Sequence, residues 1–146
     1  MFAFEKIVLF TEKYNQFIVI TEHLRTAVAN SGVKNGLAAV ITSHTTTGIM
    51  VNEALECLES DIDEALQRLA PEDHPYAHAR ILPSYGSTAG NPTGHLKSML
   101  TGNHCLFPIV DGKLVMGDAQ DIYFMEFDGP AKRTVSITIM GDETNP

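Results

Sequence analysis

The order of short apolar runs along the chain constrains the fold more than any other feature of the sequence. Residues 4–10 and 16–20 are rich in Phe, Ile and Val and are separated by Thr-Glu-Lys-Tyr-Asn, which predicts two strands joined as a hairpin. Residues 36–43 form a continuous apolar run of strand length, as expected for a buried strand. Further short strands are predicted near residues 104–110, 114–116, 121–127 and 134–140, with Asp111-Gly112 as a strong hairpin turn between the first two.

Three segments between these strands have the spacing and end signals of helices. Strands interspersed with about three helices, with hairpins at both ends, favour an α+β fold over alternating βαβ units. No repeat or linker divides the chain, so residues 1–146 are expected to form a single domain. The helices are expected from Thr21, as N-cap, to Gly32; over about 60–70, with Ser60 as cap and Pro71 after the end; and from Asn91-Pro92 to Gly102. Their expected apolar faces are Leu24, Ala27 and Val28; Ile62, Ala65, Leu66 and Leu69; and Leu96, Met99 and Leu100.

The charge balance narrows the range of partners. Ten basic residues against 18 acidic residues give a net charge of −8, so the surface repels nucleic acid and anionic lipid, and neither is expected as a partner. No apolar run approaches the roughly 18 residues that cross a bilayer. The first ten residues have the pattern of a strand and not of a signal peptide. Cys57 and Cys105 lack the spacing of a zinc or redox motif, which predicts free, buried thiols in a cytoplasmic protein.

Histidines are the residues most indicative of chemistry. His44 directly follows an apolar strand and is followed by Thr45, Thr46 and a glycine, which suits contacts with the oxygen atoms of a ligand. A threonine-rich turn with His44 hydrogen-bonded at the edge of the core explains the same residues. His78 follows the second expected helix, and His95 lies in the first turn of the third. Zinc prefers histidine nitrogens as ligands, but the spacing of His78 and His95 is not that of a metal motif.

The segment Tyr85-Gly-Ser-Thr-Ala-Gly-Asn-Pro-Thr-Gly-His95 runs from a small, flexible loop into the start of a helix. Free N–H groups and the positive end of the helix dipole make such a place a natural anion site, with Asn91, Gly94 and Lys97 as candidate phosphate contacts. An ordinary ordered loop explains the composition equally, with Lys97 as a solvated surface charge. Most carboxylates are expected at the surface, and Asp128, in Asp-Gly-Pro, is expected to form a turn.

Five motifs taken together resemble the YjbQ family, a group of small proteins often labelled secondary thiamine-phosphate synthase. The resemblance covers nearly the whole chain, and it implies a compact, mixed β-sandwich of α+β class that assembles as a homotrimer, with a polar, metal-binding site near subunit contacts. The synthase label implies joining a pyrimidine pyrophosphate to a thiazole phosphate with release of pyrophosphate. The motifs are His44-Thr-Thr-Thr-Gly-Ile-Met-Val-Asn52-Glu53, Pro71-Glu-Asp-His-Pro-Tyr76-Ala-His78, Asn91 to His95 followed by Leu-Lys-Ser-Met-Leu, Gly117 with Gln120, and Glu126-Phe-Asp-Gly-Pro130.

The chain departs from the family pattern at three places. Thr93 stands where the family usually has an acidic residue, and a hydroxyl is a poor substitute for a carboxylate toward a divalent cation. Ala119 stands where the family usually has Trp, although the neighbouring Asp118 supplies a carboxylate. Ala131-Lys132-Arg133 follows Asp-Gly-Pro in place of an immediate arginine. These changes predict a divergent member with an altered substrate or activity.

The leading hypothesis is an enzyme of this family that acts on a phosphorylated small molecule. A divalent metal ion, with zinc as one candidate, would be held by His44, His78 and His95. One alternative is metal-assisted hydrolysis of a small ester or phosphate, and another is a non-catalytic, trimeric module that binds a metal or metabolite. The candidate catalytic residues are His44, Glu53 and Gln120, and the candidate ligand contacts are Thr45, Thr46, Asn91, Gly94 and Lys97.

Overall fold

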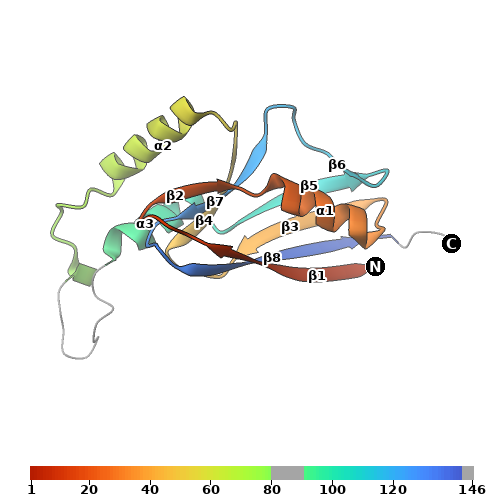
Figure 1. The fold of residues 1–146 in the computed structure, drawn as a ribbon, viewed down its shortest axis with the longest axis horizontal. Coiled ribbons are helices and arrows are strands. Elements are labelled where there is room, and N and C mark those ends of the chain that lie inside the picture. The colour runs from red at the N-terminus through yellow and green to blue at the C-terminus, as the bar shows by residue number, and fades with distance from the viewer. Residues whose placement is uncertain (80–90, 143–146) are drawn as a thin grey trace.

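The computed structural model describes residues 1–79 and 91–142, in which two antiparallel sheets pack together with three α-helices (Figure 1). The five-stranded sheet, sheet A, has the order β1-β8-β3-β5-β6, and the three-stranded sheet, sheet B, has the order β2-β7-β4. The predicted α+β fold is therefore confirmed. The strands of sheet A are β1 (Phe2–Phe10), β8 (Lys132–Gly141), β3 (Gly36–Thr42), β5 (His104–Val110) and β6 (Lys113–Leu114); those of sheet B are β2 (Gln16–Val19), β7 (Asp121–Glu126) and β4 (Thr47–Asn52).

The main hydrophobic core lies between the inner faces of the two sheets and helix α1 (Thr21–Ser31). Strand β7 is buried on both of its faces. Ile122 and Phe124 point into the main core, whereas Tyr123, Met125 and Phe127 form a second cluster under helix α2 (Glu56–Leu69). Sheet B is thus the middle layer between sheet A and α2. Because β7 is packed on both faces, it holds the residues at its end rigidly.

The predicted N-terminal hairpin is wrong. β1 pairs with β8, from Phe2 opposite Met140 to Phe10 opposite Lys132, whereas β2 pairs with β7 in the other sheet. The chain crosses from one sheet to the other between these strands, and the N–H of Thr11 donates to the carbonyl of Ala131 at the crossing. A two-strand hairpin by itself is marginal in water, so the long pairings with β8 and β7 determine where the two strands lie.

The helix ends are predicted less well than the helices themselves. Gly32 ends α1 in the left-handed conformation (φ 73°), as expected, but the helix begins at Thr21 without a side-chain cap. The Thr21 hydroxyl instead donates to Asp121. Helix α2 begins at Glu56, four residues before the expected cap at Ser60, and ends before Pro71 as expected. At the third helix, α3 (Pro92–Thr101), Asn91 holds the N-cap position but makes no side-chain cap bond.

Helix α3 buries the face opposite to the one that its apolar residues predict. Thr93, Gly94 and Lys97 are buried, whereas Met99 is 69% exposed and Leu100 is also exposed. The helix packs mainly against β4, where its small and polar residues meet the loop before that strand. In α2, likewise, Leu66 is buried and Ile62 is half-buried, but Ala65 and Leu69 are exposed. Hydrophobic spacing therefore predicted the buried face of α1, where Leu24, Ala27 and Val28 are buried, but only part of that of α2, and it failed for α3.

One face of sheet A is not covered by any helix or strand among residues 1–79 and 91–142. Residues 36–43 were expected to form a fully buried strand, but β3 alternates: Ala38, Val40 and Thr42 are buried, whereas Leu37 and Ile41 are exposed. The strand registers align these two residues with other exposed apolar side chains on one surface, called here the outer face of sheet A. It consists of Phe2, Phe4, Val8, Phe10, Leu37, Ile41, Leu106, Val110 and Met140.

The predicted turn between β5 and β6 is present. The Asp111-Gly112 turn joins β5 and β6 with positive φ at both residues (50° and 77°), as a two-residue hairpin requires. Strand β4 and a short 3₁₀ turn at Ala77–Ala79 were not predicted. Cys105 is half-buried, but Cys57 is exposed, so the expectation of two buried thiols is wrong for Cys57. Among the helices that the structure describes, none has the length and apolar character needed to span a membrane.

Candidate functional site

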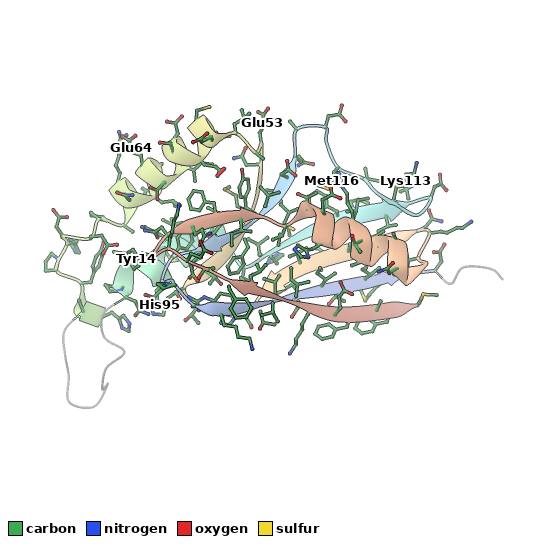
Figure 2. The ribbon with its side chains drawn as sticks, viewed as in Figure 1. Tyr14, Glu53, Glu64, His95, Lys113 and Met116 are labelled. Carbon is green, nitrogen blue, oxygen red and sulfur yellow. The ribbon has the colours of Figure 1, made fainter. Side chains whose placement is uncertain are left out.

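The end of sheet B nearest α3 brings together polar segments from distant parts of the chain. Strand β7 ends there at Glu126, which lies opposite Thr47 at the start of β4 and Gln16 at the start of β2. The loop before β4 carries His44, and the N-terminus of α3 packs against the same loop. Figure 2 shows His95 and Tyr14 close to α3 at this end of the molecule. The candidate site is built here because strand ends of one sheet hold their side chains at fixed positions.

His78 and His95 form a close pair. Their ring centroids are 4.9 Å apart, and the rings are nearly perpendicular. Both side chains line a cleft of about 330 Å³, together with Tyr76, Pro92 and Leu96. The 3₁₀ turn supplies His78, and the outward face of α3 supplies His95. The cleft is open and of a size suited to a small molecule.

A chain of hydrogen bonds fixes the protonation form of His78. The Asn91 amide nitrogen donates to Oδ2 of Asp128 at 2.8 Å, so the amide oxygen of Asn91 faces His78. That oxygen lies 2.9 Å from Nε2 of His78 and can only accept a hydrogen bond. Nε2 of His78 must therefore carry the proton, which leaves the lone pair on Nδ1 in the neutral ring. Asp128, expected only to form a turn, orients Asn91 and through it the imidazole.

His44 lies in a different environment from this pair. Its Nε2 accepts a hydrogen bond of 3.0 Å from the backbone N–H of Thr134, so the proton of the neutral ring is on Nδ1. Burial, and the nearby Arg133 guanidinium, lower the pKa of His44 against a smaller opposing effect of Glu126. The imidazole thus connects the loop before β4 to strand β8. The expectation of a hydrogen-bonded histidine in a threonine-rich turn describes this geometry, and Thr47 donates to the His44 carbonyl in the same turn.

A buried ion pair lies beside His44. Arg133 donates from Nε and Nη2 to the two carboxylate oxygens of Glu126, at 2.8 and 2.7 Å. The Thr11 hydroxyl and the Asp128 N–H also donate to this carboxylate, whose residue is fully buried. Burial raises the pKa of Glu126, but the bonds from Arg133 and Thr11 outweigh it and hold that pKa below its usual value. Arg133 also donates to Thr46, so its guanidinium is occupied by the protein itself.

The three histidines expected to hold a metal ion do not form a metal-binding group. Among residues 1–79 and 91–142, no cluster of three or more His, Cys, Asp or Glu side chains could hold a metal ion. His78 and His95 are adjacent and offer two nitrogen ligands, one fewer than a catalytic zinc site takes from a protein. Residues 80–90 contain none of these four ligand types. The described residues of one chain therefore do not supply the three ligands of a catalytic zinc site, and we assign no chemical step to a metal ion.

Four of the candidate ligand contacts are held by packing or by other protein groups. Thr46 is buried and accepts a hydrogen bond from Arg133. Gly94 is buried so closely that an added Cβ would lie 2.9 Å from the Phe127 carbonyl oxygen, which accounts for the glycine without a ligand. Asn91 bridges His78 and Asp128. Lys97 is only 1% exposed, so the expectation of a solvated surface charge is wrong. Thr45 is exposed in the turn before β4.

Glu53 and Gln120 lie at the other end of sheet B. Asn52 and Asp121 are paired at that end, whereas Thr47 and Glu126 are paired at the end that carries the histidines. Five residues of strand separate the two ends, roughly 17 Å. Figure 2 shows Glu53 near the start of α2, away from His95. Gln120 accepts a hydrogen bond from the Gly117 N–H within its own turn. The structure therefore does not bring these two residues to His78 and His95 within one chain.

Position 93 receives a carboxylate from another part of the chain. The Thr93 hydroxyl donates to Oε1 of Glu72 at 2.8 Å, and the Tyr14 hydroxyl donates to the same oxygen at 3.1 Å. Neither Glu72 nor Tyr14 was singled out in the sequence. Glu72 lies in the motif that contains His78, which was the available signal, but no local pattern links residues 14 and 72. The segment of the expected anion-binding loop before Asn91 lies outside the described residues.

The lowered pKa of His44 gives a testable pH dependence of stability. A histidine whose pKa is lower in the folded than in the unfolded state contributes stability above the unfolded value, near ~6.5, and that contribution is lost as the pH falls. His44→Gln keeps an oxygen that can accept from the Thr134 N–H but does not titrate. We expect urea unfolding to show a shallower loss of stability between pH 7 and pH 5 in this variant. His104→Gln, at an exposed histidine, is the control, and equal slopes in wild type and His44→Gln would contradict the assignment.

Comparison with known proteins places this architecture in one family. The family model for UPF0047 YjbQ-like proteins matches residues 5–142. A UPF0047 protein of Methanocaldococcus jannaschii is 35% identical over 134 residues, covering 91% of each chain. The UPF0047 protein YugU of Bacillus subtilis is 34% identical over 131 residues, covering 90% of this chain and 94% of its own.

Solved structures agree with the sequence relatives. A YbjQ-like protein of unknown function from Sulfolobus solfataricus superimposes with a TM-score of 0.88 at 28% identity, covering 97% of this chain and 99% of its own. An uncharacterised protein of the YjbQ/UPF0047 family from Clostridium acetobutylicum gives 0.84 at 38% identity, covering 93% and 99%. The family model spans nearly the whole chain, and the relatives match its sequence and its fold over the same length. The chain therefore belongs to the UPF0047 family of YjbQ-like proteins.

Proposed function

We propose that the protein is an enzyme that acts on a small phosphorylated molecule, with His78 and His95 as its acid–base pair. The observation that carries the proposal is the pair itself: two imidazoles 4.9 Å apart in an open cleft, one of them fixed with its proton on Nε2. Imidazole gains and loses a proton near neutral pH, which suits it to both halves of a proton transfer. A protonated imidazole also attracts a phosphate group to an otherwise acidic protein.

Hydrolysis of a single phosphorylated substrate is the reaction that this geometry supports best. Nδ1 of His78 accepts a proton from the attacking water, and His95 in its protonated form donates a proton to the oxygen that leaves. The new bond joins the water oxygen to phosphorus, and the bond from phosphorus to the leaving oxygen breaks. Afterwards one proton passes from His78 to His95, directly or through solvent, and the pair returns to its starting state.

The synthase reaction is the second candidate. Joining a pyrimidine pyrophosphate to a thiazole phosphate requires a site for two phosphorylated substrates, for which arginines are the usual ligands. Arg133 is engaged by Glu126, Lys97 is buried and Arg80 lies outside the described residues. Among the described residues, no arginine lines this cleft of about 330 Å³, which favours one small substrate over two. The synthase reaction is supported by the resemblance to the YjbQ family.

A product assay separates these reactions. Wild-type protein is incubated with a panel of phosphate monoesters, including p-nitrophenyl phosphate, and separately with the pyrimidine pyrophosphate and the thiazole phosphate together. Release of phosphate from one substrate supports hydrolysis, and release of pyrophosphate only when both halves are present supports the synthase. His95→Ala should abolish the activity that is found, whereas His104→Ala, at an exposed histidine on β5, should not. Binding of substrates without turnover in either panel would overturn the proposal in favour of a binding module.

We also propose that the protein forms a homotrimer in the cytoplasm and that other copies of the chain cover the outer face of sheet A. Apolar side chains of β1, β3, β5 and β8 form this face, and several are more than half exposed, such as Phe10 at 70%. A contiguous apolar surface of this kind typically marks a protein interface. The two cysteines form no disulfide, which suits a reducing compartment.

Light scattering after gel filtration tests the trimer. We expect a mass three times that of the 16.0 kDa chain, falling toward the monomer in the double variant Phe4→Lys, Phe10→Lys. The reason is that two charges would have to be buried in an apolar contact. Val19→Lys, at an exposed apolar residue of sheet B, is the matched control and should keep the wild-type mass. A monomeric wild type, or a double variant that assembles normally, would contradict this prediction.

A further inference from the structure

Lys97 is the most unusual buried group outside the histidine cleft. It lies on the inward face of α3 and is 1% exposed. Its Nζ has one hydrogen-bond partner among the described residues, Oδ1 of Asn15, at the long distance of 3.5 Å. Among the described residues, no carboxylate oxygen lies within ion-pair distance of Nζ. An ammonium group has three N–H donors, so the described residues satisfy only a small part of its hydrogen-bonding capacity.

The surroundings of Lys97 favour the neutral amine. Burial lowers the pKa of Lys97, and the carboxylates of Glu72 and Asp63 oppose this only in part. The centroid of the Phe127 ring is 6.0 Å from Nζ, the outer limit of a cation–π contact. A desolvated lysine that is neutral has an available lone pair, and this is the form of lysine that attacks carbonyl carbons.

Asn15 lines a cleft. Its volume is about 320 Å³, and its walls are mostly polar: Lys13, Asn15, Gln16, Glu59, Ser60 and Asp63. Two of these residues connect it to Lys97, because Asn15 bonds the amine and Asp63 acts on its charge. Lys97 itself does not line the cleft, and the Asn15 side chain, which accepts the long bond from Nζ, connects the two. The cleft is distinct from the histidine cleft, since Lys97 and Thr93 share one face of α3 and His95 lies on the other.

We propose that this cleft, called here the Lys97 cleft, binds a small hydroxylated aldehyde or ketone that forms an imine with Nζ of Lys97. The carboxylates of Glu59 and Asp63 accept hydrogen bonds from hydroxyl groups, and the amides of Asn15 and Gln16 both donate and accept them. The two carboxylates disfavour an anion in the same cleft. A neutral, hydroxyl-rich carbonyl compound satisfies these walls and presents its carbonyl carbon to the amine once Asn15 turns aside.

The covalent step needs no partner other than the carbonyl compound. The Nζ lone pair adds to the carbonyl carbon, and a proton moves from nitrogen to the former carbonyl oxygen to give a carbinolamine. The hydroxyl then leaves as water while the nitrogen forms a double bond to carbon. One water is released for each imine formed, and hydrolysis reverses the step.

Reductive trapping tests this proposal. The full-length protein is treated with glycolaldehyde and cyanoborohydride at pH 7, which converts an imine to a stable secondary amine, and modified lysines are mapped by peptide mass spectrometry over time. We expect Lys97 to be modified severalfold faster than Lys13, because the lowered pKa of Lys97 raises the neutral fraction of its amine at this pH. Lys13 is the matched control, since it is exposed and lines the same cleft.

Two variants at position 97 are the controls for this labelling experiment. Lys97→Met replaces the amine with an apolar chain, and Lys97→Arg keeps a cation that cannot form an imine. In either variant that folds, the rapidly modified site should be absent, and Lys13 should be modified at the wild-type rate. Labelling confined to exposed lysines, or labelling of Lys97 no faster than that of Lys13, overturns the proposal. Because the histidine cleft does not include Lys97, phosphate-ester turnover in these variants is a separate readout, and loss of one activity leaves the other interpretable.

Discussion

Arg133→Met is expected to lower the free energy of unfolding by roughly 3–5 kcal/mol, because it leaves a buried carboxylate without its cation. Glu126 is fully buried, and two of the four hydrogen bonds to its carboxylate come from Arg133. Thr11 and the Asp128 N–H remain as donors but carry no charge. The same guanidinium donates to Thr46, so the loop before β4 loses a contact as well. Urea unfolding at pH 7, analysed as a two-state transition, gives the difference directly.

The matched control is Arg25→Met. Arg25 pairs with Glu22 on the surface of α1, where the two side chains are 48% and 84% exposed, and such pairs contribute little, roughly 0–1 kcal/mol. The double variant Glu126→Gln, Arg133→Met removes both charges and should recover part of the loss. A loss in Arg133→Met as small as that in Arg25→Met would contradict the assigned role of the buried pair.

The pH dependence gives a second test of the same ion pair. Glu126 has a pKa below the usual 4.5 in the folded protein, so the stability it contributes is present above pH 4.5 and is lost as the pH falls below it. In Arg133→Met the main group that lowers this pKa is gone, and burial then favours the protonated acid. We expect the stability difference between wild type and Arg133→Met to shrink as the pH is lowered below 5. A difference that stays constant down to pH 4 would argue against the carboxylate as its cause.

His78→Ala is expected to lower kcat for the phosphorylated substrate by about 10²- to 10⁴-fold, the usual contribution of a general acid or base. Asn91→Leu and Asp128→Ala leave the imidazole in place but break the chain of bonds that fixes its protonated nitrogen. These two changes should reduce kcat by about 10- to 100-fold, because they misorient the base without removing it. Asn91 makes no side-chain cap bond to α3, so replacing it does not remove a cap.

A spectroscopic readout separates positioning from simple loss of structure. Nitrogen-15 shifts of the imidazole report which ring nitrogen is protonated. In wild type the neutral His78 ring should be in the Nε2–H form, and in Asn91→Leu the two forms should mix. His74→Ala, at an exposed histidine in the same segment, should leave both the shifts and kcat unchanged. If His78→Ala folds and retains the full rate, the acid–base role is wrong, whatever the shifts show.

Local sequence signals predicted the elements better than their partners. The Asp111-Gly112 turn and the left-handed end of α1 at Gly32 were predictable, because few residues other than glycine, asparagine and aspartate adopt positive φ at low cost. The true partners of β1 and β2 were not predictable in this way. These strands pair with β8 and β7, which lie more than 100 residues away along the chain. Periodicity likewise located α3 but gave the wrong face, since the surface that it packs against is not encoded within the helix.

The sequence by itself determined the family, the α+β class and most of the strands, and it singled out His78 and His95 as candidate site residues. Ordered motifs and short-range steric preferences carry that information along the chain. Only the tertiary structure decided how each polar group is used. His44 accepts from Thr134, 90 residues away, and Glu126 is bonded by Thr11, 115 residues away. The surroundings of a side chain are set by such distant contacts, and its protonation and reactivity follow from those surroundings. The buried amine of Lys97 and the orienting role of Asp128 therefore became visible only in the folded chain.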